Sequence, residues 1–161
     1  MKNGEHNFNY EVGQEFFEAF NEESEINGQF NVKLNLLRET RMMVLQFDIS
    51  GFLNSECHLC LEPFKFEMNE QKKLIVKFGQ ETSSENDEVM ILAENVDELN
   101  VAEHIYDYIN LAVPLRIVHP EKDNGEPGCD ENALKKIEEY KHHETESDDP
   151  RWQALKKIKF D

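Results

Sequence analysis

A two-residue alternation of apolar and polar side chains runs through the first half of the chain. Its apolar members are Val32, Leu34 and Leu36, then Met43, Leu45, Phe47 and Ile49, then Phe64, Phe66 and Met68, and finally Leu74, Val76 and Phe78. Because successive side chains of a β-strand point to opposite faces of its sheet, this period indicates strands with one buried face. We predict two antiparallel strands up to Ile49, and one long bent strand or two strands up to Phe78.

Shorter signals predict the elements around these strands. Three phenylalanines at helical spacing indicate a short helix over Gln14–Asn21. The polar, acidic run Glu81–Glu88 is typical of a mobile loop, and Val89–Leu92 is a candidate for a further short strand. A longer helix is expected over Asn100–Val113, because an asparagine cap opens it, apolar residues repeat along one side, and Pro114 ends it.

Together these elements predict an α+β fold, and 161 residues is a typical length for one domain. We expect a curved antiparallel sheet from about Gln29 to Leu92 that is covered by one long helix. A Cys-x-x-Cys knuckle is expected at one edge of the sheet, and a partly disordered C-terminal arm follows. The predicted α+β domain comprises residues 1–130, and the arm comprises residues 131–161.

The arm divides into an acidic part and a basic part. The segment Glu131–Asp149 carries too many charges to bury much apolar surface, so we interpret it as a tether. Pro150–Phe160 reverses the sign of the charge and spaces a tryptophan, a leucine and an isoleucine as on one helix face, which predicts a docking helix. Its candidate contacts to RNA or a partner are Arg151, Trp152, Lys156 and Lys157.

The whole chain is strongly acidic, with 34 aspartates and glutamates against 17 lysines and arginines and a formal net charge of −17. Its mean potential therefore repels phosphate and anionic lipid, although a local basic patch is compatible with it. The first ten residues contain no apolar secretion signal, and no apolar run approaches the ~20 residues that span a bilayer. We expect a soluble, cytoplasmic protein.

A local group of basic residues lies in the third stretch of alternation. Lys72, Lys73 and Lys77 are candidates for contact with RNA or a partner. With twice as many acids as bases in the chain, an ordinary solvated strand face is the competing interpretation. No RNA-binding signature decides between the two.

The chain has three cysteines, and two of them form the pair Cys57-His58-Leu59-Cys60. A tight turn lets two thiolates at this spacing point at one metal ion, which then needs two more ligands. Cys129 and His119 are the best candidates because both lie in the Pro/Gly-rich loop after the long helix, and His58 is the competing imidazole. We predict a structural zinc site, with three reduced cysteines as the alternative.

An enzyme is the less favoured class. A thioredoxin-like pair would stand at a helix N-terminus, whereas strand-like alternation flanks this one on both sides. The usual signatures of metalloproteases, serine hydrolases, nucleotide-binding and dinucleotide-binding enzymes do not occur in the sequence, so we predict no catalytic residues. The alternative is a zinc-dependent or thiol-redox enzyme of unknown substrate.

Three landmarks, in this order along the chain, together resemble the YceD family. The first is Gly51-Phe52-Leu53 running into Cys57-His58-Leu59-Cys60-Leu61-Glu62-Pro63. The second is Leu111-Ala112-Val113-Pro114-Leu115, followed by His119 and Cys129. The third is Asp149-Pro150 at the head of a short Leu/Lys-rich helix that continues to Ile158. Each piece is common by itself, but the ordered set covers roughly Gly51 to the C-terminus.

The resemblance implies a non-enzymatic factor in the accumulation or maturation of large-subunit ribosomal RNA. Such a factor would bind either the pre-ribosomal RNA of the large subunit or a basic ribosomal protein. The net charge favours the protein, because a chain of −17 attracts a basic client and needs a confined basic surface to hold RNA.

Overall fold

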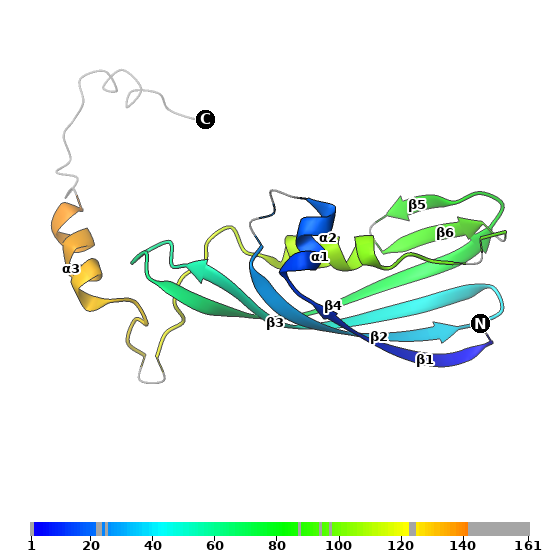
Figure 1. Cartoon of the computed structure of the whole chain (residues 1–161), viewed down its shortest axis with the longest axis horizontal. Coiled ribbons are helices and arrows are strands. Elements are labelled where there is room, and N and C mark those ends of the chain that lie inside the picture. Colours follow the sequence, from blue (N-terminus) through cyan, green and yellow to red (C-terminus); the bar gives the residue numbers. More distant parts are fainter. Residues whose placement is uncertain are drawn as a thin grey trace, which may run out of the picture.

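The computed structural model describes residues 2–21, 24, 26–86, 88–93, 95–96, 98–122 and 125–141. Along the chain they form strand β1 (Gly4–Val12), helix α1 (Gln14–Phe20), strands β2 (Gly28–Arg38), β3 (Met42–Glu56), β4 (Pro63–Gly79), β5 (Ser83–Asn86) and β6 (Val89–Ala93), and helices α2 (Ala102–Ala112) and α3 (Glu131–Tyr140). Figure 1 shows a long twisted sheet with α1 and α2 on one face and α3 beyond one end.

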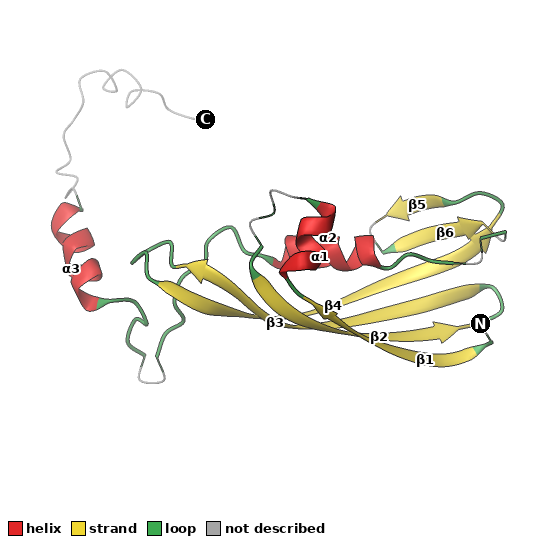
Figure 2. Cartoon of the chain, in the orientation of Figure 1, coloured by secondary structure: helices red, strands yellow, loops and turns green. Residues whose placement is uncertain are grey.

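The six strands form one sheet in the order β1-β2-β3-β4-β6-β5 (Figure 2). The predicted strands of the alternation are confirmed, as are the single long strand β4 and the short strand at Val89. Two predictions are wrong: β4 and β6 are parallel, and the expected loop Glu81–Glu88 contains strand β5. Both errors have one cause. After β4 the chain runs back through β5 at the edge of the sheet, antiparallel to the strand that follows. Strand β6 then pairs with β4 and runs in the same direction as β4.

The register of the central strands places their apolar side chains on one face. Leu34 lies opposite Phe47, and Leu45 lies between Leu36 and Leu74. All five are buried. The intervening residues of β2 alternate with them and are exposed, so the opposite face of the sheet, here called the open face, carries mostly polar side chains.

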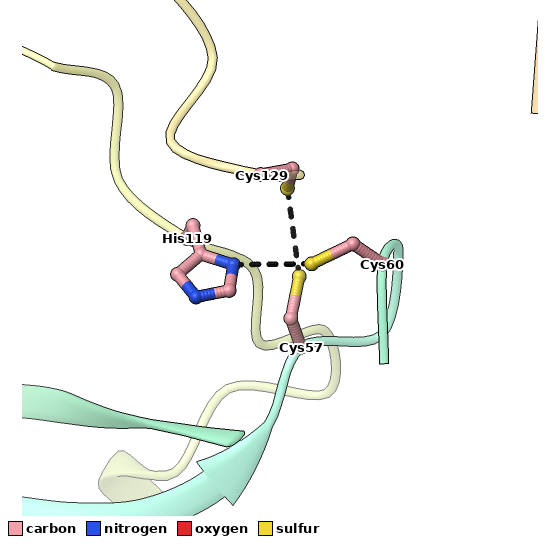
Figure 3. A group of neighbouring side chains, drawn as sticks. All are labelled: Cys57, Cys60, His119 and Cys129. Atoms are coloured by element: carbon pink, nitrogen blue, oxygen red, sulfur yellow. Dashed lines mark hydrogen bonds between the residues drawn. The ribbon is translucent and has the colours of Figure 1, made fainter. Parts of the chain in front are cut away.

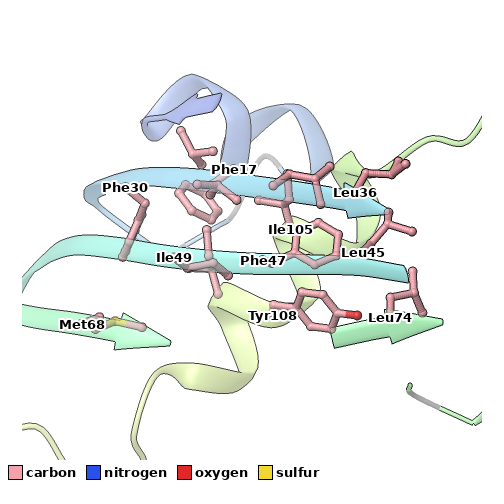
Figure 4. Packing of buried hydrophobic residues seen from close by; sticks show 14 of the residues in the cluster. Phe17, Phe30, Leu36, Leu45, Phe47, Ile49, Met68, Leu74, Ile105 and Tyr108 are labelled. Carbon is pink, nitrogen blue, oxygen red and sulfur yellow. The ribbon is translucent and has the colours of Figure 1, made fainter. Parts of the chain in front are cut away.

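Two helices cover the apolar face, which corrects the prediction of one long helix. Phe17 of α1 packs edge-on against Phe30 of β2, with ring centroids 6.0 Å apart. Tyr108 of α2 packs in the same way against Phe47 of β3 at 5.3 Å, and Figure 4 shows these rings in one cluster. The predicted helix with three phenylalanines is α1, and it covers the apolar face on the β2 side. Helix α2 has 11 residues and is too short to cover that side as well.

The C-terminal end of α2 follows the sequence signal, whereas Val101 and not the predicted Asn100 is the N-cap residue. The helix begins at Ala102, whose N–H donates to the side chain of Asn100 at 3.0 Å, and Pro114 stands two residues after its last residue. The strand β1 carries a similar signal that the sequence analysis missed. Phe8, Tyr10 and Val12 alternate with polar residues there, and the strand pairs with β2 over its whole length.

Helix α3 occupies the first part of the predicted tether. Asp130 caps it by accepting a hydrogen bond from the N–H of Ala133 at 2.8 Å, and none of its residues is buried. Residues 142–161 lie outside the described part of the chain, so the docking helix and its contact residues stay predictions.

We predict that replacement of Phe47 by alanine lowers the free energy of unfolding by about 3–5 kcal/mol, because this ring is fully buried between the sheet and α2. Phe52 of the same strand lies on the open face, with the ammonium of Lys65 4.0 Å from its ring centre. Its replacement by alanine should cost about 1 kcal/mol. Urea unfolding followed by circular dichroism measures both, and equal losses would contradict this assignment of faces.

Candidate metal centre

The Cys-x-x-Cys pair lies in the connection between β3 and β4. The N–H of Cys57 donates to the carbonyl of Glu62 at 2.9 Å, and the N–H of Leu61 donates to the carbonyl of Cys57 at 2.8 Å. Leu61 has φ 63°, in the left-handed region that L-residues rarely adopt. These contacts close a tight turn around the two cysteines, as the spacing predicted.

The loop after α2 lies beside this turn because the two backbones pair. The N–H of His58 donates to the carbonyl of Ile117 at 2.8 Å, and the N–H of Ile117 donates to Nδ1 of His58 at 3.3 Å. Further along, the loop returns so closely that a Cβ on Gly128 would stand 2.2 Å from the carbonyl oxygen of Pro120. His119 and Cys129 are thereby held next to each other.

Four side chains converge where the turn and the loop meet (Figure 3). The ligand atoms of Cys57, Cys60, His119 and Cys129 all lie within 4.8 Å of one another. Sγ of Cys57 is 3.6 Å from Sγ of Cys129, and Sγ of Cys60 is 3.3 Å from Nδ1 of His119. A tetrahedral zinc ion with ordinary bond lengths separates two sulfurs by about 3.8 Å and a sulfur from a nitrogen by about 3.6 Å. The cluster therefore has the donor types and the spacing of a zinc site.

The two candidate imidazoles have different surroundings. His119 directs Nδ1 into the cluster, and its ring packs on Phe64 with centroids 4.2 Å apart. His58 uses its Nδ1 to accept from the backbone of Ile117. The geometry thus brings His119 to the three cysteines, while His58 attaches the loop to the turn.

The cysteines differ in how readily they lose a proton. Burial raises the pKa of the Cys57 thiol, but three backbone N–H groups and the Cys60 side chain hydrogen-bond to its sulfur, and the pKa falls to about 5. Burial raises the pKa of Cys129 to about 11, helped by the hydrogen bonds and charges of the other two cysteines. Near pH 7 a bound cation would therefore meet a thiolate at Cys57 and would have to displace the proton of Cys129.

The lysines of β4 do not form one patch. Lys72 lies opposite the buried Phe47, hence on the face that carries the helices, and pairs with Glu70 at 3.6 Å. Lys73 and Lys77 alternate with it and lie on the open face. The candidates Arg151, Trp152, Lys156 and Lys157 lie outside the described residues.

Sequence reasoning missed two residues that build the site. Gly128 permits the close return of the loop, and Ile117 provides the backbone partner of His58. A glycine directly before a candidate ligand was a usable signal for the first. The sequence contained no signal for Ile117, because hydrogen bonds between the backbones of two distant loops do not depend on the type of side chain.

The fold and the cluster define a small α+β protein in which three cysteines and a histidine converge at one end of a twisted sheet. The chain belongs to the YceD family, whose model, described as "Large ribosomal RNA subunit accumulation protein YceD", matches residues 45–159. No curated protein and no solved structure gives a significant match. Within the described residues, no helix has the length and apolar character needed to cross a membrane.

We predict about one zinc ion per chain in protein purified without chelator, measured by elemental analysis. Replacement of Cys57 by serine should lower that ratio, because it removes the buried sulfur whose thiol pKa is lowered to about 5. Replacement of His6 by alanine is the control and should leave the zinc content unchanged, because this histidine lies in β1 and is not one of the four converging side chains. Metal-free protein with three freely titrating thiols would contradict the site.

We predict that replacement of Gly128 by alanine weakens zinc binding at least tenfold in competition with a chromophoric chelator. The added Cβ would clash with the Pro120 carbonyl and would move Cys129 away from His119. Gly13 has open space around its Cβ position, so its replacement by alanine should leave the affinity within twofold. An unchanged affinity in the Gly128 variant would show that the loop closure does not set the ligand geometry.

Proposed function

We propose that this protein is a non-enzymatic, cytoplasmic factor that supports the accumulation of large-subunit ribosomal RNA by binding a basic ribosomal protein. Membership of the YceD family supports the connection to this RNA. The observation that carries the choice of a protein partner is the net charge of −17. Such a chain attracts a cationic client over long distances and repels the phosphates of RNA.

Direct RNA binding is the second candidate, and it requires a confined basic surface. The division of the β4 lysines between two faces weighs against it. Lys72 is separated from the other two by the sheet itself, and its charge is offset by Glu70. Lys73 and Lys77 share the open face with Lys65, whose ammonium lies over the ring of Phe52.

The metal centre is proposed to be structural. Catalytic zinc sites use three protein ligands and keep an open position for water or substrate, whereas structural sites use four. Here four donors converge, and two of them, Cys57 and Cys129, are buried. A zinc ion would then hold the loop after α2 to the turn between β3 and β4.

Loss of this protein should lower the ratio of large-subunit to small-subunit ribosomal RNA in a deletion strain. Purification at low salt should recover a basic ribosomal protein that stays bound after nuclease treatment.

The double variant Lys73→Glu and Lys77→Glu separates the two candidates. It makes the chain more acidic, so a basic protein should bind at least as well, whereas direct RNA binding should be lost. A balanced RNA ratio would contradict the family-based role, and recovery of RNA alone would contradict the protein partner.

A further inference from the structure

Strand β1 forms one edge of the sheet. It pairs with β2 from Gly4 to Val12, and it has no second neighbour among the strands that the structure describes. An edge strand presents a row of backbone N–H and C=O groups that can pair with another extended chain. In Figure 1 this edge lies on the side of the sheet away from β5 and β6.

The two edges of the sheet differ in how well they are protected against such pairing. At the opposite edge, β5 has four residues, and its pairing with β6 is irregular between Ser84 and Asn86. Strand β1 has nine residues in unbroken register with β2. It contains no lysine, arginine or proline, and its charged residues Glu5 and Glu11 hinder pairing with an acidic strand but not with a basic one. Strand addition is therefore possible at β1 and hindered at β5.

One face of β1 borders a groove of about 660 Å³ that combines aromatic and aliphatic side chains with the polar side chains of Arg38, Thr40 and Glu98. Phe8 and Tyr10 form its outer wall and are half-buried. Leu34 and Leu36 continue its floor on β2, and Leu99 faces it from the segment before α2. A strand added to β1 would place alternate side chains beside Phe8 and Tyr10, where apolar residues bury the most surface.

The other face of β1 is acidic. Glu5, Asn7, Asn9 and Glu11 are exposed along it, and the strand carries no cationic residue. Opposite charges directly across two strands stabilise the pair, and like charges destabilise it. A second copy of this chain fits poorly, because symmetric pairing over the full strand sets Glu5 against Glu11 and joins two chains of −17.

We propose that the outer edge of β1 binds an extended basic segment of a partner protein as an added β-strand. Its apolar side chains lie against Phe8 and Tyr10, and its cationic side chains lie against Glu5 and Glu11. This inference rests on the proposed function, since it supplies the site at which a basic ribosomal protein is held. Backbone hydrogen bonds give the affinity, and the alternation of apolar and basic residues gives the specificity.

The test uses the full chain and a nine-residue peptide of alternating lysine and valine, with a glutamate–valine peptide as the probe of opposite charge. Hydrogen exchange should show slower exchange of the Gly4–Val12 amides when the lysine peptide is bound, and no change in β5. The double variant Glu5→Lys and Glu11→Lys should bind this peptide about tenfold more weakly in fluorescence anisotropy. The matched control Glu103→Lys and Glu139→Lys makes the same change in net charge on exposed helix positions and should stay within twofold.

Different failures overturn different statements. Binding of the lysine peptide that protects another element, or that survives the Glu5 and Glu11 reversal, would overturn the β1 site and leave the basic partner standing. Failure of the lysine peptide and of every basic ribosomal protein to bind would overturn the proposed function as well.

Two results with no peptide present would assign the edge to another occupant. Concentration-dependent protection of β1 would assign it to a second copy, and loss of β1 protection on Trp152→Ala would assign it to this chain's own tail.

Discussion

The register between β2, β3 and β4 is the constraint on which the rest of the molecule depends. A slip of one residue would turn Leu45 and Phe47 to solvent and bring their polar neighbours under the helices. The cover made by α1 and α2 would then have no apolar surface to bury. The same register determines where β3 ends and β4 begins, and hence where the turn with Cys57 and Cys60 stands.

The candidate metal centre joins parts of the chain that are far apart in sequence. Cys57 and Cys129 are 72 residues apart, and Cys60 and His119 are 59 apart. The β3–β4 register positions the turn, while the pairing of His58 with Ile117 and the close return at Gly128 position the loop. Ligand geometry is thus prepared by backbone contacts, and the hydrogen bonds donated to the sulfur of Cys57 outweigh the effect of burial and keep it ready to bind a cation.

The sequence predicted the parts of this structure that leave a periodic or chemical signal. Alternation located β2, β3 and β4, and the cysteine spacing with two nearby donors selected the cluster. The strand β6 was predicted, but its parallel pairing with β4 could not be, because the adjacency of two strands is a tertiary property that neither strand encodes alone. Nor could spacing separate His58 from His119, since the choice depends on which of them the Ile117 backbone engages.

Helix α3 begins two residues after the candidate ligand Cys129 and has no buried residue of its own. With no apolar face packed on the sheet, its direction is set where the chain leaves the four-ligand cluster, by Cys129 and the Asp130 cap. A cation bound there would fix the position of Cys129, from which α3 extends. The direction in which α3 leaves the cluster would depend on whether a cation is bound, so the supply of metal would control where this helix points relative to the sheet.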